Sequence, residues 1–183
     1  MTTRIDLAKK APKIYRALIA LDAATREGFD EQLADLVRIR ASQLNHCAYC
    51  INAHTADARK GGESEARIYL LNAWQEAGDV YTEREQAALL LTEAITVMSS
   101  HEYVSDEVYE RAAKHFDEEE LAQLIALIFT INSWNRIAVS TRKKPDVRCA
   151  SADTPRDVRA DGVTLGHSWG EFRPHSVDPR SGG

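Results

Sequence analysis

The sequence predicts an all-α protein, with a compact domain of about seven helices followed by an irregular C-terminal tail. Apolar residues recur at the spacing of three and four that is typical of helices, and strand-like alternation is almost absent. Capping residues mark where successive helices begin. From Pro145 onward the composition changes, because this part holds four of the five prolines and five of the nine glycines. We therefore predict a helical domain over residues 1–144 and a mostly irregular tail over 145–183.

Composition narrows the class of protein. The chain has 183 residues, 44% of them hydrophobic, and a net charge of −5, which describes an ordinary globular domain and gives no reason to expect a nucleic-acid partner. The N-terminal segment MTTRIDLAKKAPK lacks the apolar run of a signal peptide. The longest apolar run, Leu124–Ile131, is shorter than the ~20 residues that cross a bilayer. We expect a cytoplasmic protein without a membrane partner.

Four helices are predicted in the first half, over residues 12–28, 30–44, 45–62 and 64–76. Pro12 suits the first turn of the first helix, and Asp30 is a good N-cap for the second. Asn45 is the predicted N-cap of the third helix, which would place Cys47 in its first turn. The pair Gly61-Gly62 is expected to end that helix.

Three helices are predicted in the second half, over residues 82–98, 105–113 and 117–142. The segments Thr82–Glu85 and Asp117–Glu120 are capping boxes, and Ser105 is the N-cap between them. The centre of the last helix, LIALIFTI, is apolar nearly all round, so we expect it to be buried on every side or shared with another subunit. Three aromatic residues are predicted to lie in the core, namely Trp74, Trp134 and Phe129.

The stretch from Asp35 to Gly62 carries the candidate chemistry. Cys47, Cys50 and His54 are spaced i, i+3 and i+7, so they share one face of a helix. The two sulfurs are then close enough to form a disulfide. The positive end of the helix dipole favours the thiolate form of a cysteine in the first turn.

Each member of this group has a predicted role. His54 can accept the proton of Cys50, and Asp35 on the preceding helix can hold the His54 ring in the right tautomer. Which cysteine attacks first stays open at this point. The helix dipole favours Cys47 as the low-pKa thiol, whereas the nearness of His54 favours Cys50.

A zinc site is the main alternative to a redox pair. Cys47, Cys50 and His54 are acceptable zinc ligands, and Asp35 or His46 could supply a fourth. Against zinc, all three ligands would come from successive turns of one helix, whereas structural sites commonly use loops. The third cysteine, Cys149, falls outside the predicted core, so a disulfide framework is not expected. We expect neither a metal nor a cofactor.

The chain resembles a known family through residues that surround this site. They form the pattern D-x6-S-x2-N-x-C-x-Y-C-x3-H, at Asp35, Ser42, Asn45, Cys47, Tyr49, Cys50 and His54. With the segments YTEREQAALLLTEA and NSWNRIAVS, this pattern resembles the AhpD-like alkylhydroperoxidases of the carboxymuconolactone decarboxylase superfamily. The resemblance covers roughly residues 12–144 and leaves the tail unmatched.

The resemblance implies an all-α fold that assembles into a homo-oligomer, commonly a trimer or hexamer. It also implies reduction of organic hydroperoxides or hydrogen peroxide by the cysteine pair, with re-reduction by a dithiol donor such as a lipoylated protein. In that scheme Cys50 attacks the peroxide, Cys47 is the more exposed resolving cysteine, and His54 relays protons. Asp35 stands where relatives usually have glutamate, and being one methylene shorter it would reach His54 through a water.

Two other activities remain possible at this stage. A general thiol–disulfide oxidoreductase would use the same cysteine pair. A decarboxylase or related lactone enzyme of the same superfamily needs no cysteine pair, so the C-x-x-C of Cys47 and Cys50 argues against it.

Overall fold

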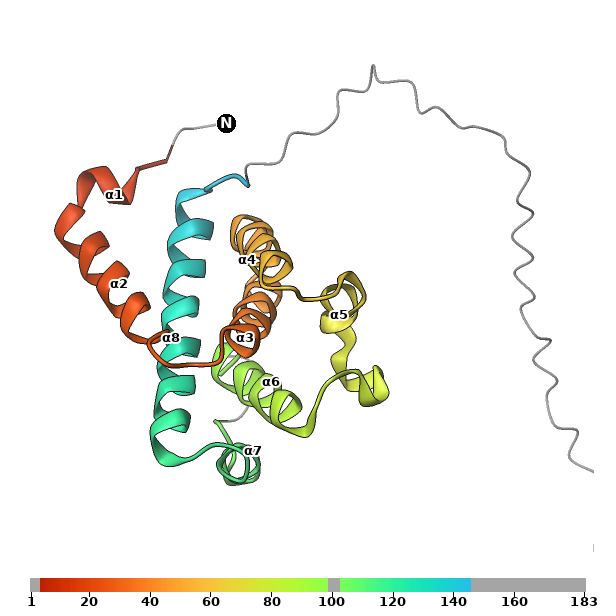
Figure 1. Ribbon diagram of the computed structural model, residues 1–183. Helices are drawn as coiled ribbons and strands as arrows, with labels where there is room; N and C mark the ends of the chain where they lie inside the picture. The colour runs from red at the N-terminus through yellow and green to blue at the C-terminus, as the bar shows by residue number, and fades with distance from the viewer. Residues whose placement is uncertain (1–3, 99–102, 146–183) are drawn as a thin grey trace, which may run out of the picture. The chain divides into compact units, whose positions relative to one another are not determined.

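The computed structural model describes residues 4–98 and 103–145, and within these ranges every regular element is a helix (Figure 1). The α-helices are α1 (Leu7–Lys10), α2 (Pro12–Ala24), α3 (Glu31–Leu44), α4 (Ala48–Lys60), α5 (Glu65–Leu70), α6 (Glu83–Thr96), α7 (Asp106–Ala113) and α8 (Glu118–Thr141). Two short 3-10 helices, η1 (Leu71–Glu76) and η2 (Gly78–Val80), join α5 to α6. The all-α prediction is confirmed. The predicted irregular tail and Cys149 lie outside the described residues, apart from Pro145.

The predicted helix starts of the second half are confirmed by side-chain caps. Thr82 with Glu85 and Asp117 with Glu120 form complete capping boxes at α6 and α8, and the Ser105 hydroxyl accepts from the Val108 N–H at the start of α7. In the first half, Asp30 caps α3 as expected. These caps are local in sequence, so the residue pattern alone is enough to predict them.

The predicted helix over 64–76 is divided. After α5 the chain tightens into η1, and Ala73 has a non-helical backbone with φ −126° and ψ 35°. A 3-10 helix has three residues per turn, which suits the packing of Leu71 and Trp74, three residues apart, in one buried cluster. The indole N–H of Trp74 donates to a carboxylate oxygen of Glu93 at 2.7 Å, which fixes the kinked segment against α6.

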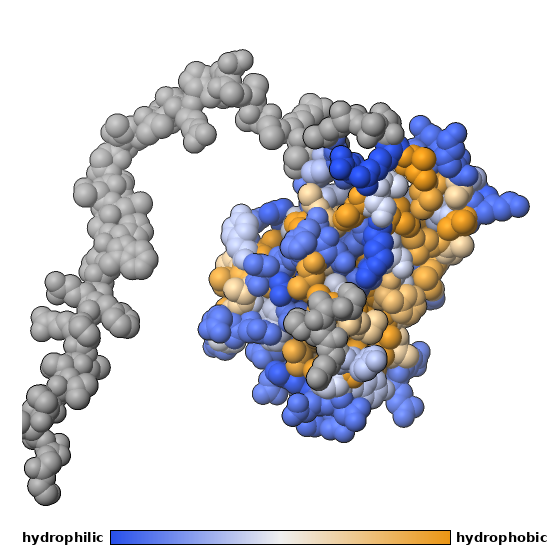
Figure 2. Space-filling view, turned by 180° about the vertical axis from the view of Figure 1, so that it is seen from behind, coloured by the Kyte–Doolittle hydropathy of each residue, from blue (hydrophilic) through white to orange (hydrophobic). Residues whose placement is uncertain are grey.

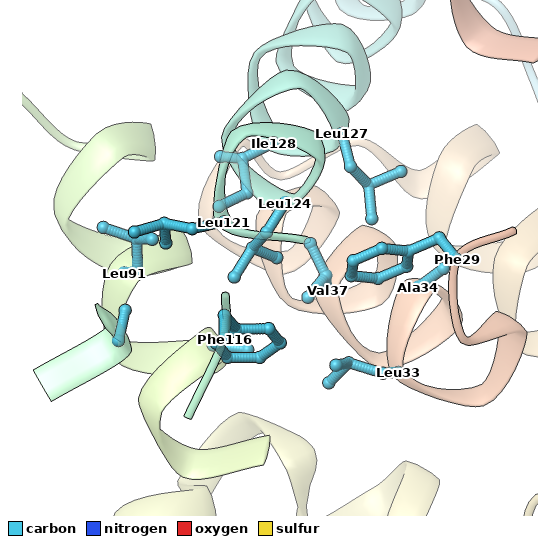
Figure 3. Packing of buried hydrophobic residues seen from close by; sticks show 12 residues of the cluster. Phe29, Leu33, Ala34, Val37, Leu91, Phe116, Leu121, Leu124, Leu127 and Ile128 are labelled. Carbon is cyan, nitrogen blue, oxygen red and sulfur yellow. The ribbon is translucent and has the colours of Figure 1, made fainter. Parts of the chain in front are cut away.

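Helix α3 is the centre of the fold. It packs against α4, α6 and α8, and its apolar residues belong to two buried clusters. In the first cluster, Leu124 and Leu127 of α8 lie against Phe29 and Val37 (Figure 3). In the second, Leu36 and Ile39 face the buried side of η1 and α6. Because α3 is buried on more than one side, two of the charged residues that it carries, Asp35 and Arg38, are also buried, and both belong to the site described below.

Helices α2 and α8 leave hydrophobic residues at the surface. No residue of α2 is buried, and Ile14 is 66% exposed. The prediction that Phe129 lies in the core is wrong, since it is 45% exposed. Trp74 is buried as predicted, and Trp134 is partly buried. In a view from behind, Figure 2 shows hydrophobic surface on the side of the body where α2 lies. Of the helices described, none is long and apolar enough to span a membrane.

Candidate active site

The two cysteines lie at the corner between α3 and α4. Cys47 is the N-cap of α4, and its sulfur accepts a hydrogen bond from the Cys50 backbone N–H at 3.3 Å. The prediction of Asn45 as N-cap is therefore wrong, because Asn45 is the C-cap of α3. Between Asn45 and Cys47, His46 adopts a left-handed backbone with φ 52°, which turns the chain from α3 into α4.

The side chain of Asn45 is used to anchor this corner instead of capping α4. Its Nδ2 lies 2.8 Å from Oδ1 of Asn132 and 2.9 Å from Oδ1 of Asn135, both on α8. Asn135 in turn donates to the buried hydroxyl of Ser42 at 3.0 Å, and Asn132 donates to that of Thr96 at 3.0 Å. We call Ser42, Asn45, Asn132 and Asn135 the asparagine clamp. Sequence reasoning missed its two α8 members, although two asparagines three residues apart in an apolar helix are a detectable signal.

Cys47 and Cys50 form a disulfide, with their Cα atoms 5.4 Å apart. The two sulfurs are thus as close as helical spacing predicts. Cys50 lines a cavity of about 550 Å³, whereas Cys47 lies outside that lining and is buried with Ala138 of α8. The expectation that Cys47 is the more exposed cysteine is not met, since it is 2% exposed and Cys50 is 4% exposed. Packing of the corner against α8 covers Cys47.

The cavity beside Cys50 lies among the N-terminal segment, α2, α4 and α8, and we call it the main cavity. Its wall includes Cys50 and His54 from α4, Tyr15 from α2 and Trp134 from α8. The Tyr15 and Trp134 rings meet edge to face, with centroids 5.3 Å apart and planes at 75°. A largely apolar cavity with a few polar groups in its wall is the common form of a small-molecule site.

His54 lines the main cavity and also a second cavity of about 370 Å³, which we call the charged cavity. Burial and, after it, the nearby charge of Arg38 lower the pKa of His54 to about 4. The imidazole is therefore neutral near pH 7 and able to accept a proton. The role of proton acceptor from Cys50 stays a prediction.

Asp35 lies in the wall of the charged cavity with His54, but its ion-pair partner is Arg38. Nη1 of Arg38 is 3.4 Å from Oδ1 of Asp35, and both side chains are buried. Among the described residues no hydrogen bond joins Asp35 to His54, so the orienting role of Asp35 stays a prediction. Burial raises the pKa of Asp35, and the positive charge of Arg38 opposes that rise.

Arg38 is a site residue that sequence reasoning missed. Its Nη2 is buried without a hydrogen-bond partner, and the side chain lines the charged cavity with His54. The sequence signal for this residue is a cation three residues after Asp35, with apolar residues directly before and after it.

Within residues 4–98 and 103–145, no group of three or more His, Cys, Asp and Glu residues is placed to hold a metal ion. The two cysteines that a zinc site would need are bonded to each other.

Comparisons with known proteins agree with the fold and place the chain in a family. The model of the carboxymuconolactone decarboxylase family matches residues 12–94. The uncharacterised protein YdfG of Bacillus subtilis strain 168 is 43% identical over 141 residues, which are 76% of this chain and 95% of that protein.

Two solved structures extend the comparison. The chain is 36% identical to a protein of unknown function from Agrobacterium tumefaciens, named as a candidate antioxidant defence protein AhpD, with a TM-score of 0.76 over 80% of this chain and 100% of that one. The debrominase Bmp8, in complex with 2,3,4-tribromopyrrole, shares the fold at 19% identity and a TM-score of 0.68, over 76% of this chain and 74% of that one. The chain therefore belongs to the carboxymuconolactone decarboxylase family, as an AhpD-like member.

Proposed function

We propose that the protein is a thiol-dependent peroxidase that reduces organic hydroperoxides or hydrogen peroxide. The observation that carries this proposal is the wall of the main cavity. There the sulfur of a disulfide-forming cysteine, Cys50, lies in the same lining as the neutral imidazole of His54. A thiolate is the form of cysteine that attacks peroxides, and a neutral imidazole is a base that produces it.

The reaction begins with the reduced pair. His54 accepts the proton of the Cys50 thiol, and the thiolate attacks the terminal oxygen of the hydroperoxide. The O–O bond breaks, Cys50 becomes a sulfenic acid, and the alkoxide takes a proton and leaves as an alcohol. The Cys47 thiol then condenses with the sulfenic acid, releasing water and forming the Cys47–Cys50 disulfide. The cavity lining favours Cys50 over Cys47 as the attacking residue.

A dithiol donor completes the cycle. One donor thiolate attacks the disulfide and forms a mixed disulfide with one cysteine. The second donor thiolate then attacks the donor sulfur of that mixed disulfide, so the donor leaves oxidised and both cysteines are reduced. A lipoylated protein is the kind of donor that the family resemblance suggests. A reducing compartment such as the cytoplasm, which the composition favours, would supply such donors. Asp35 is proposed to assist through Arg38 and His54, whose side chains line the charged cavity with it.

Hydroperoxide loss in the presence of a dithiol tests this function. We expect the protein to consume cumene hydroperoxide with dihydrolipoamide or dithiothreitol as donor, and Cys50→Ser to reduce that rate to the level without protein. In Cys47→Ser a dimedone-type reagent should trap one sulfenic acid, at Cys50. Activity that survives Cys50→Ser would exclude the mechanism, and trapping at Cys47 in Cys50→Ser would reverse the two roles.

Two control substrates separate related activities. Reduction of insulin disulfides at a higher rate than of hydroperoxide would assign the pair to general thiol–disulfide exchange. Because Bmp8 shares the fold and is a debrominase, a bromopyrrole is the second control. Bromide release without hydroperoxide loss would replace the peroxidase proposal.

A further inference from the structure

The interior of the main cavity is suited to a ring-sized apolar group. Tyr15, Trp134 and Ile137 line it together with Ala138, and the volume of about 550 Å³ far exceeds that of hydrogen peroxide. Trp134 is held in place at both ends, because its indole N–H donates to Asp22 at 3.2 Å and its ring meets Tyr15. An aromatic lining fixed in this way binds a flat apolar body better than a small polar one.

Four charged side chains also line the main cavity, and its two carboxylates already have partners. Asp6 caps α1 by accepting from the Lys9 backbone N–H at 3.2 Å, and it pairs with Nζ of Lys9 at 3.7 Å. Asp22 accepts the hydrogen bond from the Trp134 indole. Neither acid is paired with the two cations of the cavity.

Those two cations, Arg4 and Lys143, lack a carboxylate partner among residues 4–98 and 103–145. Nη1 of Arg4 donates to the Ser140 carbonyl at 2.6 Å, which leaves its other N–H groups available. Nζ of Lys143 lies 4.0 Å from the ring centroid of Tyr49. Both contacts place positive charge at the C-terminal end of α8, and Tyr49 directly precedes Cys50 in the chain.

Exposure divides the cavity into an outer and an inner part. Arg4 and Lys143 are exposed, whereas Tyr15, Tyr49 and Trp134 are partly buried and Cys50 is buried. A ligand with its negative charge at the mouth and its apolar body inside would therefore satisfy both parts. A neutral ligand would leave the two cations without an anionic partner.

We propose that the substrate is the hydroperoxide of a carboxylic acid with an apolar, ring-sized body. The carboxylate pairs with Arg4 and Lys143, the body packs on Tyr15 and Trp134, and the hydroperoxide reaches Cys50. This inference rests on the proposed peroxidase function and names its substrate class. The thiolate takes the terminal oxygen, the O–O bond breaks, and the alkoxide receives the proton held by His54. The product is the alcohol, with its carboxylate unchanged.

A matched pair of substrates tests the proposal. Cumene hydroperoxide and its para-carboxylate differ in one charged group, so their ratio of kcat/KM isolates the contribution of that charge. We expect the full-length protein at low salt to prefer the carboxylate about fivefold, as two partly exposed ion pairs would give, and to lose that preference at high salt. The double variant Arg4→Met, Lys143→Met should bring the ratio close to one.

Lys144→Met is the matched control, because Lys144 follows Lys143, is exposed and is absent from the cavity lining. It removes one positive charge, as Lys143→Met alone would, and should keep the preference of the wild type. Trp134→Leu should slow both ring-containing hydroperoxides relative to hydrogen peroxide. A wild-type ratio near one, or a ratio that the double variant leaves unchanged, would overturn the proposal.

Binding of the unreactive alcohol product keeps this test separate from that of the peroxidase function. Calorimetry with the oxidised protein compares 2-phenyl-2-propanol with its para-carboxylate. If neither hydroperoxide is consumed but the carboxylate binds better, and does so through Arg4 and Lys143, the peroxidase function fails and the anionic site stands. If cumene hydroperoxide is consumed through Cys50 with no preference in rate or binding, the substrate class fails and the peroxidase function stands.

Discussion

His54 lies in the walls of both cavities, and its burial gives the protein a distinct pH dependence. Its pKa in the folded protein is about 4, below the ordinary value of 6.5 that the unfolded chain has. Between these values the unfolded state binds more protons, so the free energy of unfolding falls as the pH is lowered from 6.5 toward 4. The loss attributable to His54 reaches up to about 3 kcal/mol.

Urea unfolding of the oxidised protein at pH 4.5, 5.5 and 7 measures this effect. His54→Gln has no titrating ring, so its stability should fall less over the same range than that of the wild type. The raised pKa of Asp35 acts in the opposite sense, since its contribution is lost as the pH rises, but both proteins share it. Parallel profiles for the two proteins would show that His54 is not buried in its neutral form.

Arg38 should control the protonation of His54 more than Asp35 does. The charge of Arg38 is the largest electrostatic contribution to the lowered pKa of His54, Arg26 contributes less, and Asp35 is not among its causes. Arg38→Met should therefore raise the pKa of His54, Arg26→Met should raise it less, and Asp35→Asn should change it least. An NMR titration of the His54 ring reports all three. The reverse order, in which Asp35→Asn causes the largest change in the pKa of His54, would restore Asp35 as the direct partner of His54.

At the scale of elements, the asparagine clamp holds the α3–α4 corner that carries the cysteines. Asn135 accepts from Asn45 at 2.9 Å and donates to Ser42 at 3.0 Å, and its side chain is fully buried. Asn135→Ala leaves both partners without that bond, which should lower the free energy of unfolding by about 2–3 kcal/mol. The rate of disulfide formation after peroxide addition should fall as well, because the corner that positions Cys47 and Cys50 loses its anchor.

Ser133→Ala is the control for that measurement. Ser133 lies on the same helix, but its hydroxyl donates only to the Phe129 carbonyl in its own helix. Its removal should change stability by less than about 0.5 kcal/mol. If both substitutions lower the free energy of unfolding by the same amount, the clamp would contribute no more than an ordinary helical hydrogen bond.

The same elements show what the sequence can and cannot predict. Caps such as Thr82 with Glu85 depend on contacts three residues apart, so the helix starts are predictable from pattern alone. The role of Asn45 depends on partners 87 and 90 residues away, which no local pattern contains. The cysteine pair and His54 follow from spacing on one helix. Asp35 and Arg38 are also only three residues apart on one helix. Their burial, and the two cavities that His54 lines, follow from tertiary packing.

At the scale of the whole molecule, the hydrophobic surface left by α2 and α8 favours a homo-oligomer. Ile14 is 66% exposed, Ile19 is 49% exposed and Phe129 is 45% exposed, although each belongs to a helix that also contacts the body. A second copy of the chain would cover such a surface. When the same patch on two copies meets, the assembly is closed. The family resemblance favours a trimer or a hexamer.

Size-exclusion chromatography with light scattering tests assembly, and we expect a mass that is a multiple of 20.4 kDa. Ile14→Glu together with Ile19→Glu should shift that mass toward one chain, because a charge on α2 would have to be buried at the interface. Tyr69→Glu on α5 is the control, since Tyr69 is 69% exposed but lies on a helix that packs on η1 and not on the α2 side. A wild-type mass near that of one chain would contradict assembly. An oligomer that the α2 variant leaves intact would move the interface to another face, and Phe129→Glu would then test α8.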